Sequence, residues 1–267
     1  MNKLTYIWHD CFVFENDKLM IIFDYWKDPL TSADSLPLFI EYADKNKPIY
    51  VIVSHHHKDH YSKRIFEWCK LFNDIKYIIS KDIAKYSRHI LSDKSIYKGP
   101  KPNKDSVIIL SAGERYIDKR ITIEAYGSTD IGNSYVVMSK GMKLFHAGDL
   151  NAWIWKEQST EEEIDKSINN YISILLQIKS IHIDFDIVMF PVDSRIGSDY
   201  YIGAKIFLQY FDVRHFFPMH FGLGDTPRQQ LKYQLDATKT EYYANPTRGE
   251  YICLQSPYST FLYPEII

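Results

Sequence analysis

The 267-residue sequence has few cysteines and no strong excess of charge of either sign. Its three cysteines, Cys11, Cys69 and Cys253, are odd in number and widely spaced, which argues against a disulfide framework and fits a reducing compartment. The formal net charge of −2 gives no reason to expect nucleic acid or an anionic membrane as a partner. No apolar run approaches the roughly 20 residues of a membrane helix, and no signal-peptide pattern is visible. We therefore expect a cytoplasmic protein.

Short apolar runs alternate with turns, and no repeat or linker divides the chain. Ile49–Val53 (IYVIV) is apolar and β-branched on both faces, which predicts a central strand. Apolar spacing predicts a helix over Ser62–Phe72, and the capping-box pattern of Ser159 with Glu162 predicts another that ends near Ile178. We expect further strands at Leu4–Trp8, Phe12–Phe14, Leu19–Phe23, Lys76–Ser80, Val107–Leu110, Tyr116–Ile117, Ile121–Ala125, Ser134–Ser139, Met142–His146, Asp186–Pro191, His215–Met219, Tyr251–Leu254 and Thr260–Tyr263.

These strands fall into two groups, and each group is accompanied by helical segments. Two further helices are expected at Lys81–Leu91 and Tyr200–Phe211, and Lys140–Gly141 reads as a hairpin turn. The pattern predicts an α/β fold with two sheets and helices outside, in a single domain over residues 1–267.

The segment Ser54–His60 (SHHHKDH) follows the central strand directly and is the most informative part of the chain. Five of its seven residues can bind a metal, and cations such as zinc prefer imidazole nitrogen and carboxylate oxygen. His55 and His57 are two positions apart, so in an extended loop they point the same way, while Asp59 can turn toward an adjacent position. Loops at the carboxyl ends of strands are where open α/β sheets place their chemistry. The segment therefore predicts a metal site.

The pattern His55-x-His57-x-Asp59-His60 after an apolar strand resembles the signature of the metallo-β-lactamase superfamily. The resemblance implies a four-layer αβ/βα sandwich and a metal-dependent hydrolase. The branch that contains the L-ascorbate-6-phosphate lactonase is the nearest in pattern. Further segments that carry the resemblance, in chain order, are Leu19–Asp24, Phe145–Asp149 (FHAGD), Pro191, Gly203, Ala204 and Phe217–His220 (FPMH).

The resemblance also implies which residues bind metal. His55 and His57 would hold a first ion, and Asp59 and His60 a second. The second ion would also take His220, while Asp149 would bridge the two ions. Asp59 would in addition orient the attacking water, which makes it the candidate catalytic residue.

One departure from the family pattern concerns the first ion. The family usually has a further histidine for it, but no histidine lies between His89 and His146 here. Asp130 could substitute as an oxygen ligand and Ser128 is a weaker candidate, while a simple polar turn is the alternative. The cofactor is expected to be Zn²⁺, as one or two ions, and an oxygen-richer site could favour Mn²⁺ or iron.

Several residues outside the motif are candidates for contacts with substrate or for support of a metal ligand. His9 comes just before an N-terminal strand, and Asp24 could hold a metal-bound histidine. Arg195 could pair with a substrate carboxylate or phosphate, or form only an ion pair. Trp153 and Trp155 could line a pocket or serve packing alone.

The predicted function is hydrolysis of a small ester, lactone or phosphoester by metal-activated water. A nuclease is one alternative, although no basic arm is evident. A metal-binding or sensing module without catalysis is another, and the missing histidine favours it. Substrate and oligomeric state stay open.

Overall fold

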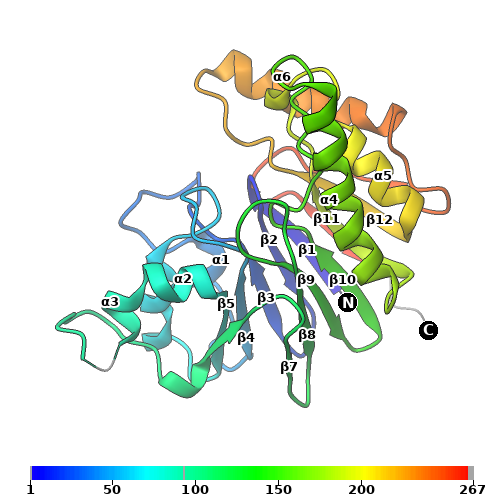
Figure 1. Ribbon diagram of the computed structural model, residues 1–267. Helices are drawn as coiled ribbons and strands as arrows, with labels where there is room; N and C mark the ends of the chain where they lie inside the picture. Colours follow the sequence, from blue (N-terminus) through cyan, green and yellow to red (C-terminus); the bar gives the residue numbers. More distant parts are fainter. Residues whose placement is uncertain (1, 93, 264–267) are drawn as a thin grey trace. The chain divides into compact units, whose positions relative to one another are not determined.

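The computed structural model describes residues 2–92 and 94–263, which form two compact units (Figure 1). The first unit holds the described residues up to Leu110 and those from Leu254 onward, and the second holds Ser111–Cys253. Each unit contains a seven-stranded mixed sheet of its own, so the prediction of two sheets is confirmed.

The strands of the first unit are β1 (Asn2–Trp8), β2 (Cys11–Glu15), β3 (Met20–Phe23), β4 (Ile49–Val53), β5 (Ile75–Ser80), β6 (Val107–Leu110) and β14 (Thr260–Tyr263). Their order in the sheet is β14-β1-β2-β3-β4-β5-β6. Strands β3 to β6 are parallel, and the pairs from β14 to β3 are antiparallel. All five residues of β4 are buried between two parallel neighbours, as an apolar run on both faces predicts.

The helical segments of the first unit are short: α1 (Leu38–Glu41), η1 (Lys63–Lys70), α2 (Lys81–Tyr86), α3 (Arg88–Leu91) and η2 (Lys104–Ser106). The helix predicted over Ser62–Phe72 has 3₁₀ geometry, since Ile65 N–H bonds Ser62 O and Leu71 N–H bonds Trp68 O. Over eight residues, apolar spacing does not separate a period of 3.0 from one of 3.6, and this is why the sequence gives the place but not the type of helix.

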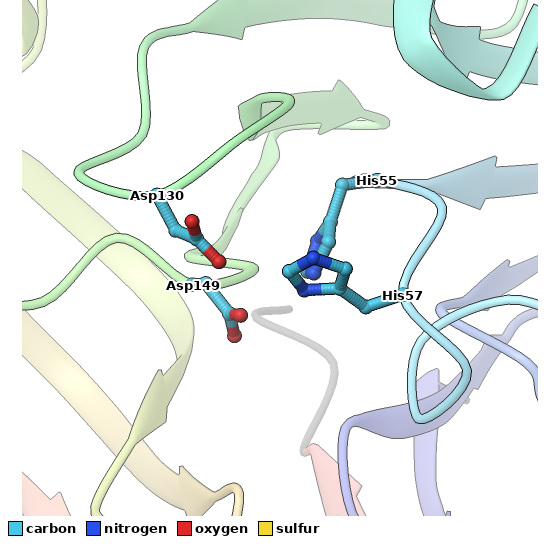
Figure 2. A group of neighbouring side chains, drawn as sticks. All are labelled: His55, His57, Asp130 and Asp149. Atoms are coloured by element: carbon cyan, nitrogen blue, oxygen red, sulfur yellow. The ribbon is translucent and has the colours of Figure 1, made fainter.

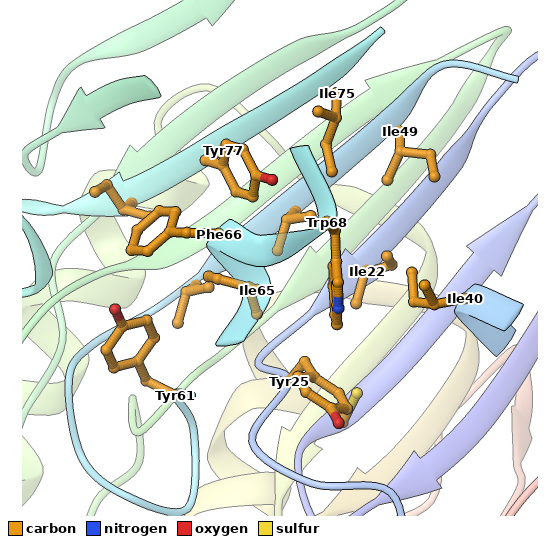
Figure 3. Close-up of a cluster of buried hydrophobic side chains, with 14 of the residues drawn as sticks. Ile22, Tyr25, Ile40, Ile49, Tyr61, Ile65, Phe66, Trp68, Ile75 and Tyr77 are labelled. Carbon is orange, nitrogen blue, oxygen red and sulfur yellow. The ribbon is translucent and has the colours of Figure 1, made fainter. Parts of the chain in front are cut away.

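The hydrophobic core of the first unit and two backbone hydrogen bonds hold the segment that follows β4 in place. Trp68 of η1 is 1% exposed, and its ring lies 5.0 Å from that of Tyr25 (Figure 3). Ser62 N–H donates to Tyr25 O at 3.0 Å, and Asp24 N–H donates to Ile52 O at 3.0 Å. The loop from β4 to η1 is thus fixed at both ends against the residues that follow β3.

The strands of the second unit are β7 (Arg115–Ile117), β8 (Thr122–Tyr126), β9 (Ser134–Ser139), β10 (Met142–His146), β11 (Asp184–Pro191), β12 (Asp212–Met219) and β13 (Glu250–Tyr251). Their order is β13-β12-β11-β10-β9-β8-β7, with β10 to β13 parallel and β7 to β10 antiparallel. Lys140 and Gly141 have φ of 50° and 77°, which suits the predicted two-residue hairpin. The strand expected over Tyr251–Leu254 ends at Tyr251.

The helical segments of the second unit are α4 (Glu161–Lys179), η3 (Ser194–Ile196), α5 (Ile202–Tyr210), α6 (Pro227–Lys239) and η4 (Thr240–Tyr242). Helix α4 begins one residue later than predicted, because the capping box is formed by Thr160 and Glu163. The N–H of Ser159 closes the preceding turn by bonding Trp155 O at 2.9 Å, so it is not available for the reciprocal bond of a capping box. Among the described helices, none combines the length and hydrophobicity that a membrane span requires.

Candidate metal centre

The histidine loop of the first unit begins where β4 ends. His55 and His57 lie on this loop with their ring centroids 4.5 Å apart (Figure 2). A ring nitrogen of His55 lies within 4.8 Å of a ring nitrogen of His57. The structure therefore brings these two predicted ligands together, and the parallel strands β3 and β4 position their loop by ending side by side.

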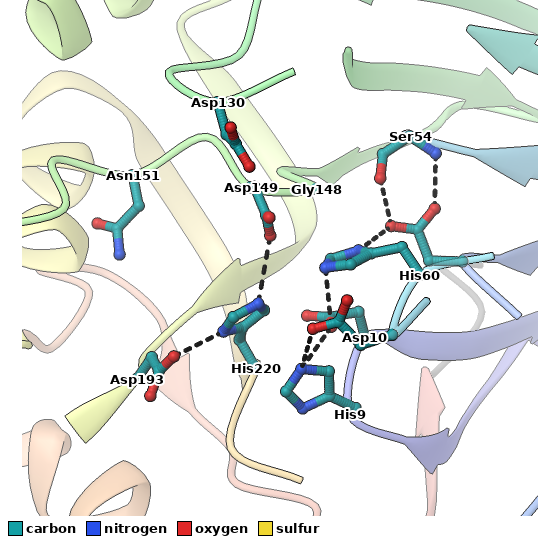
Figure 4. A network of polar contacts seen from close by, with 12 residues as sticks. His9, Asp10, Ser54, His60, Asp130, Gly148, Asp149, Asn151, Asp193 and His220 are labelled. Carbon is teal, nitrogen blue, oxygen red and sulfur yellow. Dashed lines mark hydrogen bonds and ion pairs between the residues drawn. The ribbon is translucent and has the colours of Figure 1, made fainter. Parts of the chain in front are cut away.

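A buried carboxylate, Asp24, organises this loop. Its Oδ1 accepts from Ser54 N–H at 2.7 Å, and its Oδ2 accepts from the Ser54 hydroxyl at 2.6 Å and from His60 Nδ1 at 2.8 Å (Figure 4). Asp24 is 1% exposed and adopts a positive φ of 42°, a backbone conformation that aspartate tolerates better than most residues. The residue is therefore fixed in place beside His60, and its support of a metal-bound histidine stays a prediction.

These bonds also set the tautomers of two histidines. His60 donates from Nδ1 to Asp24, so in the neutral ring Nε2 carries the lone pair. The Ser54 hydroxyl gives its one proton to Asp24, so at 2.9 Å it accepts from His55 Nδ1, and His55 Nε2 likewise carries the lone pair. Both histidines are thus prepared to bind a cation through Nε2, as metal-ligating histidines with a hydrogen-bonded second nitrogen usually do.

Replacing Asp24 by asparagine is expected to weaken zinc binding by about 10–100-fold. The amide offers one acceptor oxygen in place of two, so it cannot serve both Ser54 donors and His60. Competition with a chromophoric chelator measures the affinity. Asp82→Asn is the matched control, because Asp82 anchors His56 of the same loop through its N–H (2.8 Å) and Nδ1 (3.0 Å) and bonds none of the predicted ligands. Equal affinity of Asp24→Asn and wild type would contradict the supporting role.

A second group in the first unit lies where the β1–β2 turn meets the same loop. His9, at φ 58°, points Nε2 toward Asp10 Oδ2 at 3.1 Å and Asp59 Oδ2 at 3.5 Å. His60 Nε2 lies 3.4 Å from Asp10 Oδ2. The structure thus places the predicted residue His9 beside both Asp10 and Asp59, and the predicted residue His60 beside Asp10, to which no role was assigned from the sequence. The sequence feature that could have indicated Asp10 is its place directly after His9, between two segments in which apolar and polar residues alternate.

In the second unit, Asp130 and Asp149 lie on two loops, after β8 and after β10 (Figure 2). A carboxylate oxygen of Asp130 lies within 4.8 Å of a carboxylate oxygen of Asp149. Thr129 Oγ1 joins the loops by donating to Asn151 O at 2.6 Å. Ser128 Oγ accepts from Asp130 N–H at 3.3 Å, so the structure uses this hydroxyl to shape the turn.

His220 follows β12 at a positive φ of 69° and is held from both sides. Its Nδ1 donates to Asp193 Oδ2 at 2.9 Å, and its Nε2 faces Asp149 Oδ1 at 3.3 Å (Figure 4). Residues held at positive φ cost about 1–3 kcal/mol each and cluster at functional sites. His220 is thus supported as His60 is, by a carboxylate on Nδ1.

Arg195 completes this arrangement through Asp193. Its Nε and Nη2 donate to the two oxygens of Asp193 at 2.8 and 2.6 Å. Burial would raise the pKa of Asp193, but hydrogen bonds from His220 and Arg195 outweigh it and hold the pKa well below its usual value. Asp193 therefore stays ionised, and the Arg195 side chain that pairs with it remains 32% exposed.

These groups line a pocket of about 510 Å³ in the second unit. Its size is in the range of small-molecule sites. Trp153 packs its ring 5.4 Å from that of His220, and its Nε1 donates to Asp149 O at 2.8 Å. The lining residues are Thr129, Asp130, Asp149, Trp153, Trp155, Asp193, Arg195 and His220.

In each unit taken by itself, the donor atoms suit a divalent cation of the zinc or manganese type. They are imidazole nitrogens and carboxylate oxygens, mostly buried, and three of the histidines have Nδ1 hydrogen-bonded. The arrangement fits ligands for metal rather than a nucleophilic serine or cysteine. Burial raises the pKa of the Cys11 thiol, which makes it an unreactive neutral group.

Known proteins share this fold. Igni18, described as a novel metallo hydrolase from the hyperthermophilic archaeon Ignicoccus hospitalis, is 17% identical with a TM-score of 0.63, covering 98% of this chain and 99% of that one. The metallo-beta-lactamase fold protein YhfI from Bacillus subtilis is 12% identical with a TM-score of 0.58, covering 98% and 100%. The diiron β-hydroxylase CmlA from Streptomyces venezuelae is 10% identical with a TM-score of 0.62, covering 97% of this chain and 54% of CmlA. No curated protein sequence matches.

A family model described as a beta-lactamase superfamily domain matches residues 3–166. The matched region contains the histidine loop and Asp149, while His220 lies beyond it. Together with the likeness to solved structures, the match confirms the predicted metallo-β-lactamase-like α/β fold class. The chain belongs to the beta-lactamase superfamily.

Proposed function

We propose that this protein is a metal-dependent hydrolase that acts on a small ester, lactone or phosphoester. One observation carries the proposal: His55, His60 and His220 each have Nδ1 bonded to a buried oxygen, which prepares Nε2 to bind a cation. The family's relatives include a metallo hydrolase, which supports the same reaction class. Within the family, the motifs favour the branch of the L-ascorbate-6-phosphate lactonase.

We propose the ligand assignment that the family pattern gives, residue by residue. His55, His57 and Asp130 serve a first ion, and Asp130 takes the place of the usual histidine. Asp149 bridges, and the whole chain works as one functional domain in the cytoplasm. Zn²⁺ is the expected ion, and the carboxylate in place of histidine extends the range to Mn²⁺ or iron. The ligands of the second ion are Asp59, His60 and His220.

Bound divalent ions lower the pKa of a coordinated water and polarise the attacked carbonyl or phosphoryl group. The protein's own residues supply orientation and binding. Asp59, whose side chain is 27% exposed, orients the attacking water through its carboxylate. Trp153 and Trp155 give the pocket apolar walls, and the exposed edge of Arg195 attracts a carboxylate or phosphate group of the substrate.

Elemental analysis of protein prepared without chelator tests the proposal. We expect two metal ions in wild type and one in Asp130→Ala, with Ser128→Ala as the matched control that keeps two. A parallel screen of lactones, carboxylic esters, phosphomonoesters and phosphodiesters is expected to show turnover that chelation abolishes. One ion in both wild type and Asp130→Ala would remove Asp130 from the site and indicate a mononuclear protein. No metal after reconstitution, and no turnover, would overturn the hydrolase in favour of a binding module.

A further inference from the structure

Two loops of the second unit supply most of the lining of its pocket. The loop between β10 and α4 carries Asp149, Trp153 and Trp155. The loop between β11 and α5 carries Asp193 and Arg195. Because β10 and β11 are parallel neighbours, both loops leave the sheet at the same edge. The distance between Trp155 and Arg195 across the pocket therefore depends on contacts between the two loops.

Glu157 makes a direct contact between these loops. Its Oε1 accepts from Ser198 N–H at 3.1 Å, and this bond is the main reason that the pKa of Glu157 lies below its usual value. Within its own loop, Glu157 lies in a turn that is closed by the N–H groups of Gln158 and Ser159, which both bond Trp155 O at 2.9 Å. The carboxylate thus links the backbone that carries Trp155 to the opposite loop.

Gly197 leaves room for this contact. Its backbone has φ 114° and ψ −160°, a conformation that is essentially restricted to glycine. A Cβ atom on residue 197 would lie 2.0 Å from Glu157 Oε2. Any larger residue would therefore displace the carboxylate from Ser198 N–H. A contact between surface side chains does not ordinarily need such a backbone, so Gly197 sets this one apart.

A second contact between the same loops is weaker. Lys156 Nζ lies 2.9 Å from Asp199 Oδ2, and the lysine side chain is 57% exposed. Ion pairs between exposed side chains contribute little, because water screens the charges and two long side chains must be ordered. We therefore expect the bond of Glu157 to the backbone of Ser198 to fix the spacing of the loops.

We propose that Glu157 and Gly197 are positioning residues that hold Trp155 at a fixed distance from Arg195 and so determine which substrates fit the pocket. The inference rests on the proposed function in one respect, that this pocket receives the substrate. It goes further in naming what sets the pocket's width. The substrate is expected to present a compact group to Trp155, because a wall tied to the opposite loop does not retreat from a larger one.

Fluorine NMR of the full chain labelled with 5-fluorotryptophan tests the positioning without any need for turnover. The sequence has five tryptophans, and replacing each by phenylalanine assigns its resonance. Glu157→Ala is expected to shift or broaden the resonance of Trp155 and to leave that of Trp68 unchanged. Glu157→Gln keeps an acceptor oxygen for Ser198 N–H and is expected to restore the wild-type spectrum. Gln158→Ala is the matched control, because its exposed side chain bonds no described residue.

Steady-state kinetics on the best substrate of the screen test the effect on binding. Glu157→Ala is expected to raise KM by about 10-fold and to leave kcat within about 2-fold, because it removes binding that the ground and transition states share. Gly197→Ala is expected to raise KM in the same way, since its Cβ displaces the Glu157 carboxylate. Glu157→Gln and Gln158→Ala are expected to keep the wild-type KM.

The outcomes separate the two proposals. A wild-type Trp155 resonance in Glu157→Ala would overturn the inference while leaving the hydrolase intact. Equal changes in Glu157→Gln and Glu157→Ala, or in Gln158→Ala, would also overturn it. A fall in kcat at unchanged KM would overturn the role in substrate fit. Wild-type protein that turns over nothing would overturn the proposed function, and the Trp155 resonance would still decide whether Glu157 positions the wall.

Discussion

Asp59→Asn is expected to lower kcat/KM by about 10³-fold or more. Positioned acid–base groups contribute about 10²–10⁴-fold, and the substitution also removes the negative charge of the proposed metal ligand. Asp59 lies 3.5 Å from His9 Nε2 and is 27% exposed, so it is the one carboxylate of the histidine loop that water can reach. Steady-state kinetics on the best substrate of the screen measure the loss, with metal content determined on the same sample.

The metal content of Asp59→Asn distinguishes two causes of the loss in kcat/KM. Lys58→Ala is the matched control, because Lys58 is the exposed neighbour in the loop and is expected to leave kcat/KM within a few-fold. A variant that keeps its full metal content but loses turnover assigns Asp59 to orientation of water. A variant that loses one ion assigns it to metal binding. Wild-type kinetics in Asp59→Asn would remove it from the mechanism.

Trp68→Ala is expected to lower the free energy of unfolding by about 3–5 kcal/mol. The indole is 1% exposed, and its ring centroid lies 5.0 Å from that of Tyr25 (Figure 3). It lies 6.1 Å from the ring centroid of Phe39. Removing it leaves a cavity between η1 and the face of the sheet, where Trp68 packs in one core cluster with Ile22 and Val51. Denaturant unfolding of metal-free protein, followed by circular dichroism, measures the change.

Trp155→Ala is the matched control for this substitution. Trp155 is 39% exposed, and its removal is expected to change the free energy of unfolding by no more than about 0.5 kcal/mol. Because Ser62 bonds Tyr25 across the same cluster, Trp68→Ala should also weaken zinc binding by the histidine loop. A loss below about 1 kcal/mol in Trp68→Ala would show that the surrounding rings collapse into the space.

Strands were the most predictable part of the fold. Ile49–Val53 agrees with β4 at both ends, because a run that is apolar on both faces has no other stable place than between parallel neighbours. The pairing of β14 with β1 was not predictable, since their partners are about 260 positions apart and nothing local specifies the match.

Helix α6 shows the opposite case, in which capping signals were present and apolar residues are few. Thr226, Pro227 and Gln229 form a capping box with proline in the first turn. Leu231 and Leu235 are four positions apart, yet both are exposed, and Ala237 is the only buried residue among the described residues of this helix. Prediction from apolar periodicity therefore passes over it.

The candidate site likewise has a part that is predictable from local sequence and a part that is not. The motif from His55 to His60 is local and carries its own chemistry, so the sequence was sufficient to propose it. The bonds that orient it are long-range: Asp24 is 36 positions from His60, and Asp193 is 27 positions from His220. Which carboxylate supports which histidine depends on how strand ends meet, and this appears only in the folded chain.

The antiparallel pair of β14 and β1 has a consequence for synthesis on the ribosome. Leu110 ends β6 and Thr260 begins β14, and between them the chain builds the whole second unit. At roughly 5–20 residues per second, translation of those 150 positions takes roughly 8–30 s. During that time β1 has an uncovered outer edge, which is open to pairing with foreign strands. The sheet that is synthesised first is therefore completed last. The rate of translation and the binding of chaperones determine how often the exposed edge of β1 pairs with a foreign strand before β14 is made.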